Sequence, residues 1–349
     1  MAEENLSAVL NLKGEINLEN RKVPEPKPDE ALIAIHTVGI CGSDVHFWKN
    51  GRIADLIVRN PLVLGHETSG VVAKVGSEVK HLKPGDRVCL EVGIPCRRCE
   101  FCLGGRYNLC PYVTFAATPP TDGTLCRYFA INADFCFKLP DHVSLEEGAL
   151  IEPLSVAVHA CRRAGVEAGK IILICGAGPI GLVNILSCKA MGASKICITD
   201  ISENRLEVAK TLGAHPVCVK GLDADEVADM IRSKLGGPPD ITLECSGAEA
   251  SIRNAIMVTK SGGTVMLVGL GAPEVTVPII EASIREVDIK GIFRYANCYP
   301  IALGLVASGA VDVKPLITHR FKLEESVKAF ETSHSGAGGA IKVLINCAK

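Results

Sequence analysis

The first part of the chain alternates short apolar runs with breaks that contain glycine and proline. Between Leu6 and about Pro153 these runs include Ala31–Gly39, Ser69–Gly76 and Arg87–Val92. Runs of strand length bounded by turn residues are typical of antiparallel sheets. This region is therefore predicted to form a small, mostly antiparallel barrel with long loops.

From about Ala157 to Lys290 the pattern changes to aliphatic runs that alternate with segments of helical length. One helix is expected at Ser202–Leu212, with Ser202 as its N-cap. Strands in alternation with helices build a doubly wound parallel sheet. The chain is thus predicted to be an α/β protein, with parallel strands at residues 171–175, 195–199, 216–219, 240–245, 264–269 and 287–291.

The chain after Ile292 is too short for a further domain. A helix is expected at Tyr299–Ser308 and strands at Ile317–Lys322 and Ile341–Ile345, which rejoin the first region. A chain of 349 residues favours two domains, one of residues 1–153 and 292–349 and a second of residues 154–291. The apolar run Glu274–Ile280 is either an edge strand that pairs across a dimer or an ordinary buried strand.

The second domain opens with the pattern of a dinucleotide-binding unit. An aliphatic strand leads into Gly176-x-Gly178-x-x-Gly181, and an apolar helix follows. Gly176 permits a tight turn, Gly178 lets backbone N–H groups approach a pyrophosphate, and Gly181 lets the helix pack closely on the strand. The next strand ends at Asp200, whose carboxylate accepts both ribose hydroxyls of NAD and repels the 2′-phosphate of NADP. This order of elements predicts NAD binding.

Composition and charge argue against several classes of partner. The net charge is −2 and the pI is near 6.5, which gives no reason to expect nucleic acid or an anionic membrane as partner. The sequence has no apolar run that approaches membrane-spanning length, and its N-terminus lacks the pattern of a signal peptide. The 16 cysteines are then expected as thiols or metal ligands in a reducing compartment, by default the cytoplasm.

Four cysteines lie close together on one loop: Cys96, Cys99, Cys102 and Cys110. Thiolates at this spacing can close a tetrahedral zinc site, which stabilises a loop that has little core of its own. Iron–sulfur clusters also take four thiolates, but their usual spacings differ. Because a closed site has no open coordination position, this zinc is predicted to be structural.

A catalytic metal needs other ligands, and two short segments offer them. One contributes Cys41, and the other contributes the adjacent His66 and Glu67. A thiolate, an imidazole and a carboxylate leave a fourth position for water or substrate, as a catalytic zinc requires. Ser43 is placed to carry the substrate proton outward, and His46 to extend that relay. Neighbours in a regular strand point to opposite faces, so His66 and Glu67 can share an ion only where the backbone is irregular.

Glu152 is a second acidic residue with a catalytic interpretation. It stands in the apolar run Leu150–Leu154, and a charge in such a place requires a partner. A metal ion or a water on that ion would serve. The residues alone leave open whether Glu67 or Glu152 ligates the metal, and they also allow Cys41 to be a buried thiol and His66 a loop histidine.

Taken together, these motifs resemble the zinc-dependent medium-chain alcohol dehydrogenases, and among them the sorbitol (polyol) dehydrogenases or ketose reductases. The likeness covers nearly the whole chain. Its polyol-specific part is the combination of Glu67, Glu152 and residues 293–295. The segments that carry the likeness are Gly39–His46, Gly51–Ile53, Gly65–Gly70, Cys96–Cys110, Ala117–Pro120, Glu147–Ser155, Gly176–Gly181 and Arg285–Tyr295.

The resemblance implies a GroES-like barrel as the catalytic domain, a Rossmann domain that binds NAD, and a homotetramer. It implies that Cys41, His66 and Glu67 hold the catalytic zinc with a water, and that Glu152 contacts this water or completes the shell. The implied substrate residues are Phe115, Thr118, Glu152, Arg294 and Tyr295. The implied cofactor residues beyond the glycines are Ile180, Asp200, Arg205, Val268, Gly269, Leu270, Ile292, Phe293 and Arg294.

Two features depart from parts of the family. Phe47, also expected near the substrate, stands where sorbitol dehydrogenases often have tyrosine, so one substrate hydroxyl loses a partner. Some animal members lack the four-cysteine loop, whereas this chain keeps all four thiols. Two zinc ions per subunit are therefore expected, one catalytic and one structural.

The predicted activity is the reversible, NAD-dependent oxidation of sorbitol or xylitol at C2 to the ketose. One alternative is another zinc alcohol dehydrogenase or a threonine-type dehydrogenase, which residues 293–295 argue against. A second is an NADP-preferring ketose reductase, which Asp200 argues against. A third is a nucleotide-binding structural relative without activity, although such proteins generally lose the zinc ligands. The physiological polyol and the reaction direction are not encoded.

Overall fold

The computed structural model describes residues 4–349, and the chain divides into two compact units. Unit 1 comprises the chain up to Glu152 together with Tyr299–Ser308 and Val313–Lys349. Unit 2 comprises Pro153–Cys298 and Gly309–Asp312. Residues 292–298 thus belong to unit 2, whereas the sequence pattern assigned them to the first domain.

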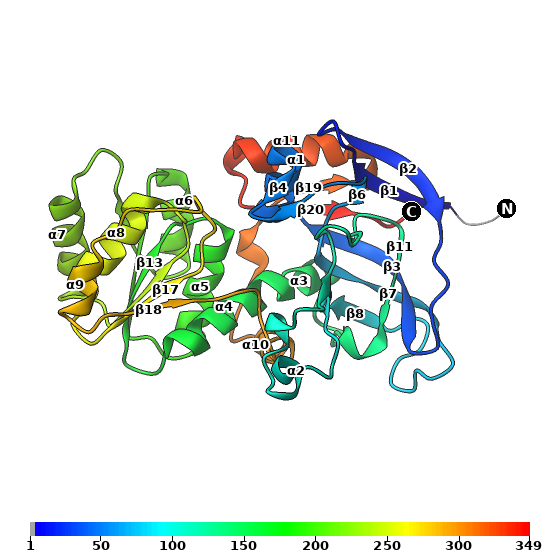
Figure 1. The fold of residues 1–349 in the computed structure, drawn as a ribbon, viewed down its shortest axis with the longest axis horizontal. Coiled ribbons are helices and arrows are strands. Elements are labelled where there is room, and N and C mark those ends of the chain that lie inside the picture. The colour runs from blue at the N-terminus through cyan, green and yellow to red at the C-terminus, as the bar shows by residue number, and fades with distance from the viewer. Residues whose placement is uncertain (1–3) are drawn as a thin grey trace. The chain divides into compact units, whose positions relative to one another are not determined.

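Unit 1 is built on one large sheet, which has seven strands within residues 4–349. Its strands are β3 (Glu30–Gly39), β7 (Glu67–Val75), β8 (Arg87–Leu90), β11 (Tyr128–Asn132), β12 (Cys136–Lys138), β19 (Ile317–Lys322) and β20 (Lys342–Asn346). The order is β12-β8-β7-β3-β20-β19, and β11 also pairs with β3 (Figure 1). Only the β19–β20 pairing in this sheet is parallel among the described strands. Both predictions, a mostly antiparallel domain and C-terminal strands that rejoin it, are confirmed.

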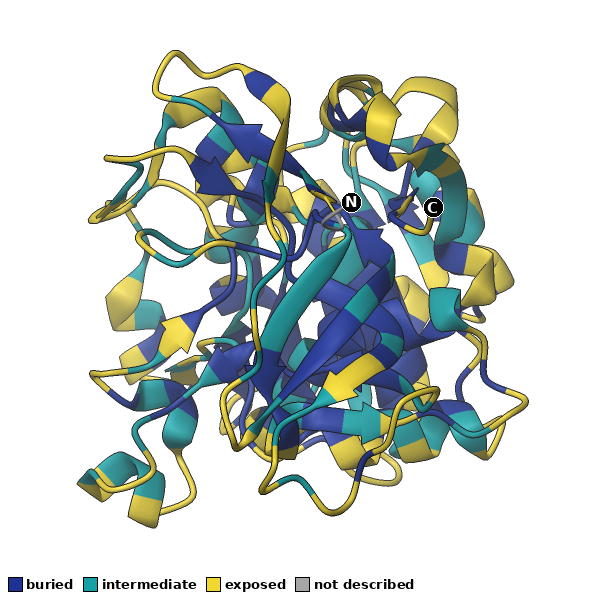
Figure 2. Ribbon diagram, turned by 90° about the vertical axis from the view of Figure 1, so that its right-hand side faces the viewer, coloured by how far each residue is buried: buried dark blue, intermediate teal, exposed yellow. Residues whose placement is uncertain are grey.

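Shorter elements surround this sheet. The strands are β1 (Glu4–Leu10), β2 (Ile16–Lys22), β4 (Arg52–Ile53), β5 (Leu56–Ile57), β6 (Leu62–Val63), β9 (Gly93–Ile94) and β10 (Thr114–Phe115). The helices are α1 (Gly42–Asn50), α2 (Glu100–Leu103), α3 (Leu145–Ala149), α10 (Tyr299–Ala307) and α11 (Ser326–Ser335), and α4 (Ile151–Ala164) begins here and continues into unit 2. Figure 2 shows dark blue along part of the strands, and most of the yellow residues lie on loops and helices.

Unit 2 contains the predicted parallel sheet, which has six strands in the described chain. They are β13 (Ile171–Cys175), β14 (Lys195–Asp200), β15 (His215–Cys218), β16 (Ile241–Glu244), β17 (Thr264–Leu267) and β18 (Asp288–Gly291). The helices between them are α5 (Pro179–Ala190), α6 (Glu203–Thr211), α7 (Ala224–Leu235), α8 (Glu249–Val258) and α9 (Ile279–Ser283). Every pairing is parallel, and the order is β15-β14-β13-β16-β17-β18.

The centre of this sheet is apolar because helices cover it on both faces. Ile172, Leu173 and Ile174 of β13 are fully buried, as a near-continuous aliphatic run predicts. The strand order reverses between β13 and β16, since the chain runs outward in both directions from this pair. In doubly wound sheets the crevice at such a point, beyond the carboxyl ends of the strands, is where ligands bind.

The interpretation of Glu274–Ile280 as a strand is wrong. Most of this segment is irregular and solvent-accessible, and its last two residues begin α9. Pro278 lies just before the helix and provides no backbone N–H for a ladder. The edge of the parallel sheet is formed by β18 instead.

Candidate functional site

The four predicted zinc thiolates come together in unit 1. Within residues 4–349 they are the only set of three or more potential ligands whose donor atoms all lie within 4.8 Å of one another. The Sγ of Cys102 is 3.9 Å from the Sγ of Cys96 and 3.4 Å from that of Cys99. A tetrahedron of sulfurs about 2.3 Å from a zinc ion has edges of about 3.8 Å. The loop geometry therefore fits the predicted structural zinc.

The pKa values of two of these thiols also fit a cation site. Backbone N–H groups, that of Arg98 first, lower the pKa of Cys96 to about 6. Burial and the neighbouring thiols raise the pKa of Cys102 to about 12. Cys96 is thus the readier of the two to ionise, while Cys102 resists a negative charge. A divalent cation would remove this conflict by stabilising all the thiolates at once.

Arg97 fastens the cysteine loop to the barrel. Its backbone takes a left-handed φ of 64°, and its Nη1 lies 3.2 Å from Asp134 Oδ2. Its Nη2 donates to Asn132 Oδ1, and the guanidinium lies 5.4 Å from the ring centroid of Phe135. Because Asn132 is the last residue of β11 and Asp134 lies just after it, these contacts tie the loop to the main sheet.

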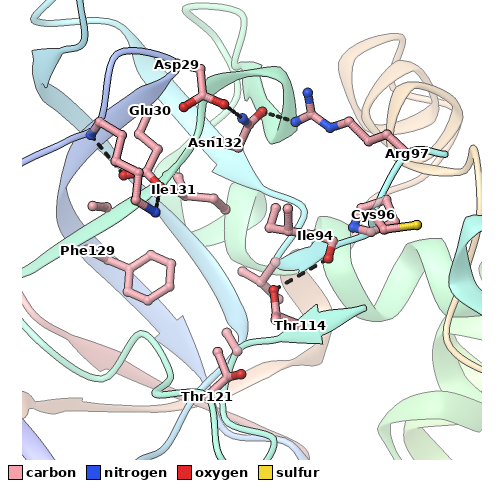
Figure 3. A pocket seen from close by; sticks show the side chains of 15 residues that line it. Asp29, Glu30, Ile94, Cys96, Arg97, Thr114, Thr121, Phe129, Ile131 and Asn132 are labelled. Carbon is pink, nitrogen blue, oxygen red and sulfur yellow. Dashed lines mark hydrogen bonds and ion pairs between the residues drawn. The ribbon is translucent and has the colours of Figure 1, made fainter. Parts of the chain in front are cut away.

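The same stretch of chain borders a cavity of about 520 Å³. Figure 3 shows its side chains, with Phe129 and Ile131 from β11 on one side and Thr114 and Thr121 on another. Its charged groups pair with one another: Lys27 Nζ is 2.9 Å from Glu30, and Asn132 joins Asp29 to Arg97. None of the predicted catalytic-zinc or substrate residues lines this cavity, so it is separate from the predicted catalytic chemistry.

Cys41 and His66 lie close together in unit 1. Cys41 is the N-cap residue of α1, and its side chain is one of the neighbours that raise the pKa of His66. Ser43 Oγ is 3.5 Å from His66 Nε2, and the Phe115 ring centroid is 5.7 Å from that of His66. His66 precedes β7 in irregular backbone, next to Gly65 with a φ of 89°. The irregularity that metal binding by His66 and Glu67 requires is therefore present.

Asp44 is a buried residue of this site that the sequence analysis missed. Its carboxylate accepts the backbone N–H groups of Cys41, at 3.1 Å, and Gly65, at 3.0 Å. Its Oδ1 also lies 3.3 Å from Nδ1 of His66. Burial alone would lower the pKa of His66, but Asp44 and then Cys41 raise it well above its ordinary value. Asp44 thus fixes both segments and orients the imidazole, as carboxylates beside metal-binding histidines do.

The carboxylate of Glu67 is paired with Lys342, a second residue that the sequence analysis missed. Lys342 Nζ lies 2.7 Å from each Glu67 oxygen and 3.1 Å from the carbonyl of Ile40. Both side chains are buried. Burial lowers the pKa of Lys342, but the charge of Glu67, with those of Cys41 and Glu152, raises it above its ordinary value.

Gly39 makes room for this ion pair. A Cβ at Gly39 would lie 2.1 Å from Oε2 of Glu67, so any larger residue would displace the carboxylate. Gly39 and Glu67 are also partners in the β3–β7 register. In the structure Glu67 thus forms an ion pair with Lys342. The donor atoms of Cys41, His66 and Glu67 do not all lie within 4.8 Å of one another.

Glu91 and Glu152 are also buried in the same unit. Glu152 is in the first turn of α4, and its charge acts on both Lys342 and Glu91. Burial raises the pKa of Glu91 to about 7, although Tyr107 donates to it at 2.6 Å. A nearby positive charge would stabilise the ionised form of these buried carboxylates. Their presence therefore fits a zinc ion in this region.

The other residues implied in unit 1 differ in exposure. Phe47 is 3% and Phe115 is 6% exposed, whereas His46 is exposed and lies 3.4 Å from Asn50. Thr118 follows the left-handed Ala117. Phe47 and Phe115 are thus buried and His46 is exposed, and the substrate and proton-relay roles of these residues stay predictions.

Unit 2 places the glycine motif as predicted. Gly176 has a φ of 97° in the turn after β13, and Gly178 caps α5 with nothing within 4 Å of an added Cβ. A Cβ at Gly181 would lie 1.8 Å from the carbonyl of Gly176. Asp200 accepts the N–H of Ala177 at 2.7 Å, so its carboxylate is fixed beside the glycine turn. There is free space beside the backbone of Gly178, where a phosphate would approach. The backbone at Gly181 is packed against the turn, as the dinucleotide-binding motif requires.

The remaining implied residues of unit 2 lie in two segments and around the glycine turn. Arg294 has a left-handed φ of 52° and its guanidinium lies 4.6 Å from the ring centroid of Phe293, whereas Tyr295 is buried. Leu270 is 65% exposed in the loop after β17. The others are solvent-accessible to an intermediate degree: Ile180, Arg205, Val268, Gly269 and Ile292.

None of the helices that the structure describes is both long and apolar enough to cross a membrane.

Comparisons with known proteins show which families the chain is similar to. Residues 27–141 match the alcohol dehydrogenase GroES-like domain, and residues 179–308 match the zinc-binding dehydrogenase domain. Human sorbitol dehydrogenase is 56% identical over 344 residues, which cover 98% of this chain and 96% of that protein. Among solved structures, an Escherichia coli oxidoreductase of unknown specificity has a TM-score of 0.93 at 38% identity, with 99% of each chain covered. A Sinorhizobium meliloti protein described as a zinc-binding dehydrogenase and bound to NADP has a TM-score of 0.90 at 29% identity, with the same coverage of both chains.

Proposed function

Because the chain belongs to the zinc-binding alcohol dehydrogenases with a GroES-like domain, we propose that it is an NAD-dependent polyol 2-dehydrogenase. It oxidises sorbitol or xylitol at C2 to the 2-ketose, and the reaction reverses at high NADH. The full-length similarity to sorbitol dehydrogenases carries the proposal, since it spans every segment that holds a proposed site residue.

Cys41 and His66 would hold the catalytic zinc together with a carboxylate, from either Glu67 or Glu152. When bound, the zinc lowers the pKa of the substrate hydroxyl. Ser43, 3.5 Å from His66, would take up the hydroxyl proton while it releases its own toward the exposed His46, which would pass a proton to solvent. The four cysteines would hold a second zinc, which is structural.

NAD rather than NADP is the proposed cofactor. When bound, it would supply the acceptor for the hydride that leaves C2. Asp200 is held beside the glycine turn by the N–H groups of Ala177 and Ser202, at 2.7 and 2.8 Å. Its carboxylate is thus fixed where it accepts ribose hydroxyls and repels a 2′-phosphate.

The substrate hydroxyls would contact Arg294 and Tyr295, because the guanidinium offers several fixed donors to a polyol. Phe47, Phe115, Thr118 and Glu152 are the substrate residues proposed in unit 1. A phenylalanine at position 47 offers no hydroxyl, so this position would contribute shape rather than a hydrogen bond.

We also propose a homotetramer in the cytoplasm. The edge of the parallel sheet at β18, and the neighbouring exposed Ile279, Ile280 and Ile284, support self-association, because exposed edges and apolar patches favour pairing. All 16 cysteines in the structure are free thiols, which suits a reducing compartment.

Product identification tests the proposed reaction. The purified, zinc-loaded protein is incubated with sorbitol and either NAD or NADP, and the sugar products are separated by chromatography. The proposal predicts fructose, the C2 ketose, with NAD as the preferred cofactor. Oxidation at another carbon, or faster turnover with NADP, would contradict it.

A further inference from the structure

Glu244 is a buried carboxylate at the carboxyl end of β16. It is 1% exposed, and β16 lies beside β13 at the point where the strand order reverses. The loops that follow these two strands border the crevice in which doubly wound sheets bind dinucleotides. None of the roles proposed above uses Glu244.

Donors from a single turn and from α8 surround this carboxylate. Oε1 accepts the N–H and the Oγ–H of Ser246 at 2.9 and 2.5 Å, and the Oγ–H of Ser251 at 2.9 Å. The N–H of Gly247 lies 3.1 Å from Oε1 and 3.0 Å from Oε2. These donors compensate the buried charge, so that Glu244 needs no cation and fixes the turn Ser246–Gly247.

The turn Ser246–Gly247 lies between two loops that would contact the cofactor, the glycine turn after β13 and the loop after β17. A Cβ on Gly176 of the glycine turn would lie 3.1 Å from Ser246. On the other side, a Cβ on Gly271 would lie 1.8 Å from the carbonyl of Gly247, and one on Gly269 would lie 2.3 Å from its nitrogen. The main chains are therefore packed too closely for the turn to move alone.

The backbone of Glu244 holds the second loop as well. Its carbonyl accepts the N–H groups of Val268 and Gly269, both at 2.8 Å. The side chain and the carbonyl of one residue thus fix the turn after β16 and the loop after β17 together.

We propose that Glu244 is a positioning residue for the nicotinamide half of NAD. It acts through the turn Ser246–Gly247 on the loop Val268–Gly271, and it does not itself touch the cofactor. This inference rests on the proposed NAD-dependent function, in which Val268, Gly269 and Leu270 contact the nicotinamide half.

The test is Glu244→Gln, measured by calorimetric titration of NADH into the zinc-loaded protein. Glutamine keeps one oxygen for the serines but turns an NH₂ group toward the N–H of Gly247, which leaves two donors opposed. We expect NADH to bind about tenfold more weakly and KM for NAD to rise in parallel. The kcat at saturating NAD and the KM for sorbitol are expected to change less than about twofold, since neither reports on the free cofactor site.

Two more variants make the experiment specific. Glu249→Gln changes an exposed glutamate at the start of α8, which accepts the N–H of Thr276 at 3.0 Å, and it is expected to bind NADH as the wild type does. Ser251→Ala removes one donor to Glu244 and changes no residue of the turn itself, so Glu244 holds the turn less firmly and about a threefold loss is expected. It therefore still tests the inference if Glu244→Gln fails to fold.

The outcomes separate this inference from the proposed function. Wild-type NADH affinity in folded Glu244→Gln, or in Ser251→Ala if the former does not fold, would overturn the positioning role. An equal loss in Glu249→Gln would overturn it too. If the wild type itself bound no NADH and oxidised no polyol, the proposed function would fail, and this inference with it.

Discussion

The buried ion pair between Lys342 and Glu67 gives the most quantitative prediction. Lys342→Met removes the partner that lies 2.7 Å from both Glu67 oxygens, while it keeps the length of an unbranched side chain. The side chains of both residues are at most 4% exposed, so water does not replace the lost charge. Breaking a buried pair from one side costs about 3–5 kcal/mol, because the other charge stays buried and uncompensated.

The cost is expected to depend on the catalytic zinc. In a Cys41→Ser background, which lacks one proposed ligand, Lys342→Met should lose the full about 3–5 kcal/mol. In the zinc-loaded protein the loss should be smaller, since the nearby cation compensates Glu67. Lys322→Met, at an exposed position of the neighbouring β19, should cost less than about 0.5 kcal/mol in both.

Trp48 makes the measurement selective for unit 1. It is the single tryptophan of the chain and lies in α1. Its ring packs edge-on to Phe330 of α11, with 5.7 Å between the ring centroids. Urea unfolding followed by its fluorescence reports the free energy of unfolding of this unit. A loss below about 1 kcal/mol in the Cys41→Ser background would refute the argument that the pair is an anchor. Equal losses with and without the catalytic zinc would refute the coupling to the metal.

Three further predictions concern the same unit. Asp44→Asn removes the charge beside His66 and should weaken retention of the catalytic zinc about 10–100-fold in chelator competition, whereas unchanged retention would exclude the orienting role. Glu91 has a folded pKa of about 7 against an ordinary 4.5, so the wild type loses stability as pH rises through 7. Glu91→Gln should therefore match it near pH 4.5 and be more stable by up to about 3 kcal/mol at pH 8 in denaturation, and a pH-independent difference would contradict this. Cys110→Ser should lower the zinc content by about one ion per chain and lower Tm, whereas Cys126→Ser, at a buried thiol outside the cluster, should leave the zinc in place.

Local patterns predicted the fold well because its elements have strong periodicity. All the parallel strands formed near their expected ranges. Short aliphatic runs between segments of helical length are typical of buried parallel strands. Glu274–Ile280 was misassigned because apolar content alone does not distinguish an exposed loop and a short helix from a strand. The proline before α9 and the exposure of Ile279 and Ile280 indicate a surface segment instead.

The site was predicted only where its residues form a local motif. The four cysteines and the glycine turn each lie within a short segment, so their spacing reveals their chemistry. Lys342 and Glu67 are separated by 275 positions, and only the folded β3, β7 and β20 bring them together. A lysine in an apolar strand was the available signal, since a buried ammonium requires a counter-charge. Asp44 and Glu244 were missed because hydrogen bonds to backbone N–H groups leave no spacing pattern.

The central claim, a zinc-dependent polyol dehydrogenase, is tested most directly by initial rates of NAD reduction. Sorbitol, xylitol and ethanol are compared with and without a zinc chelator, followed by zinc re-addition. The account predicts turnover of both polyols well above that of ethanol, loss of this activity on chelation, and its return with zinc. Comparable turnover of ethanol, or polyol oxidation that is indifferent to chelation, would contradict it.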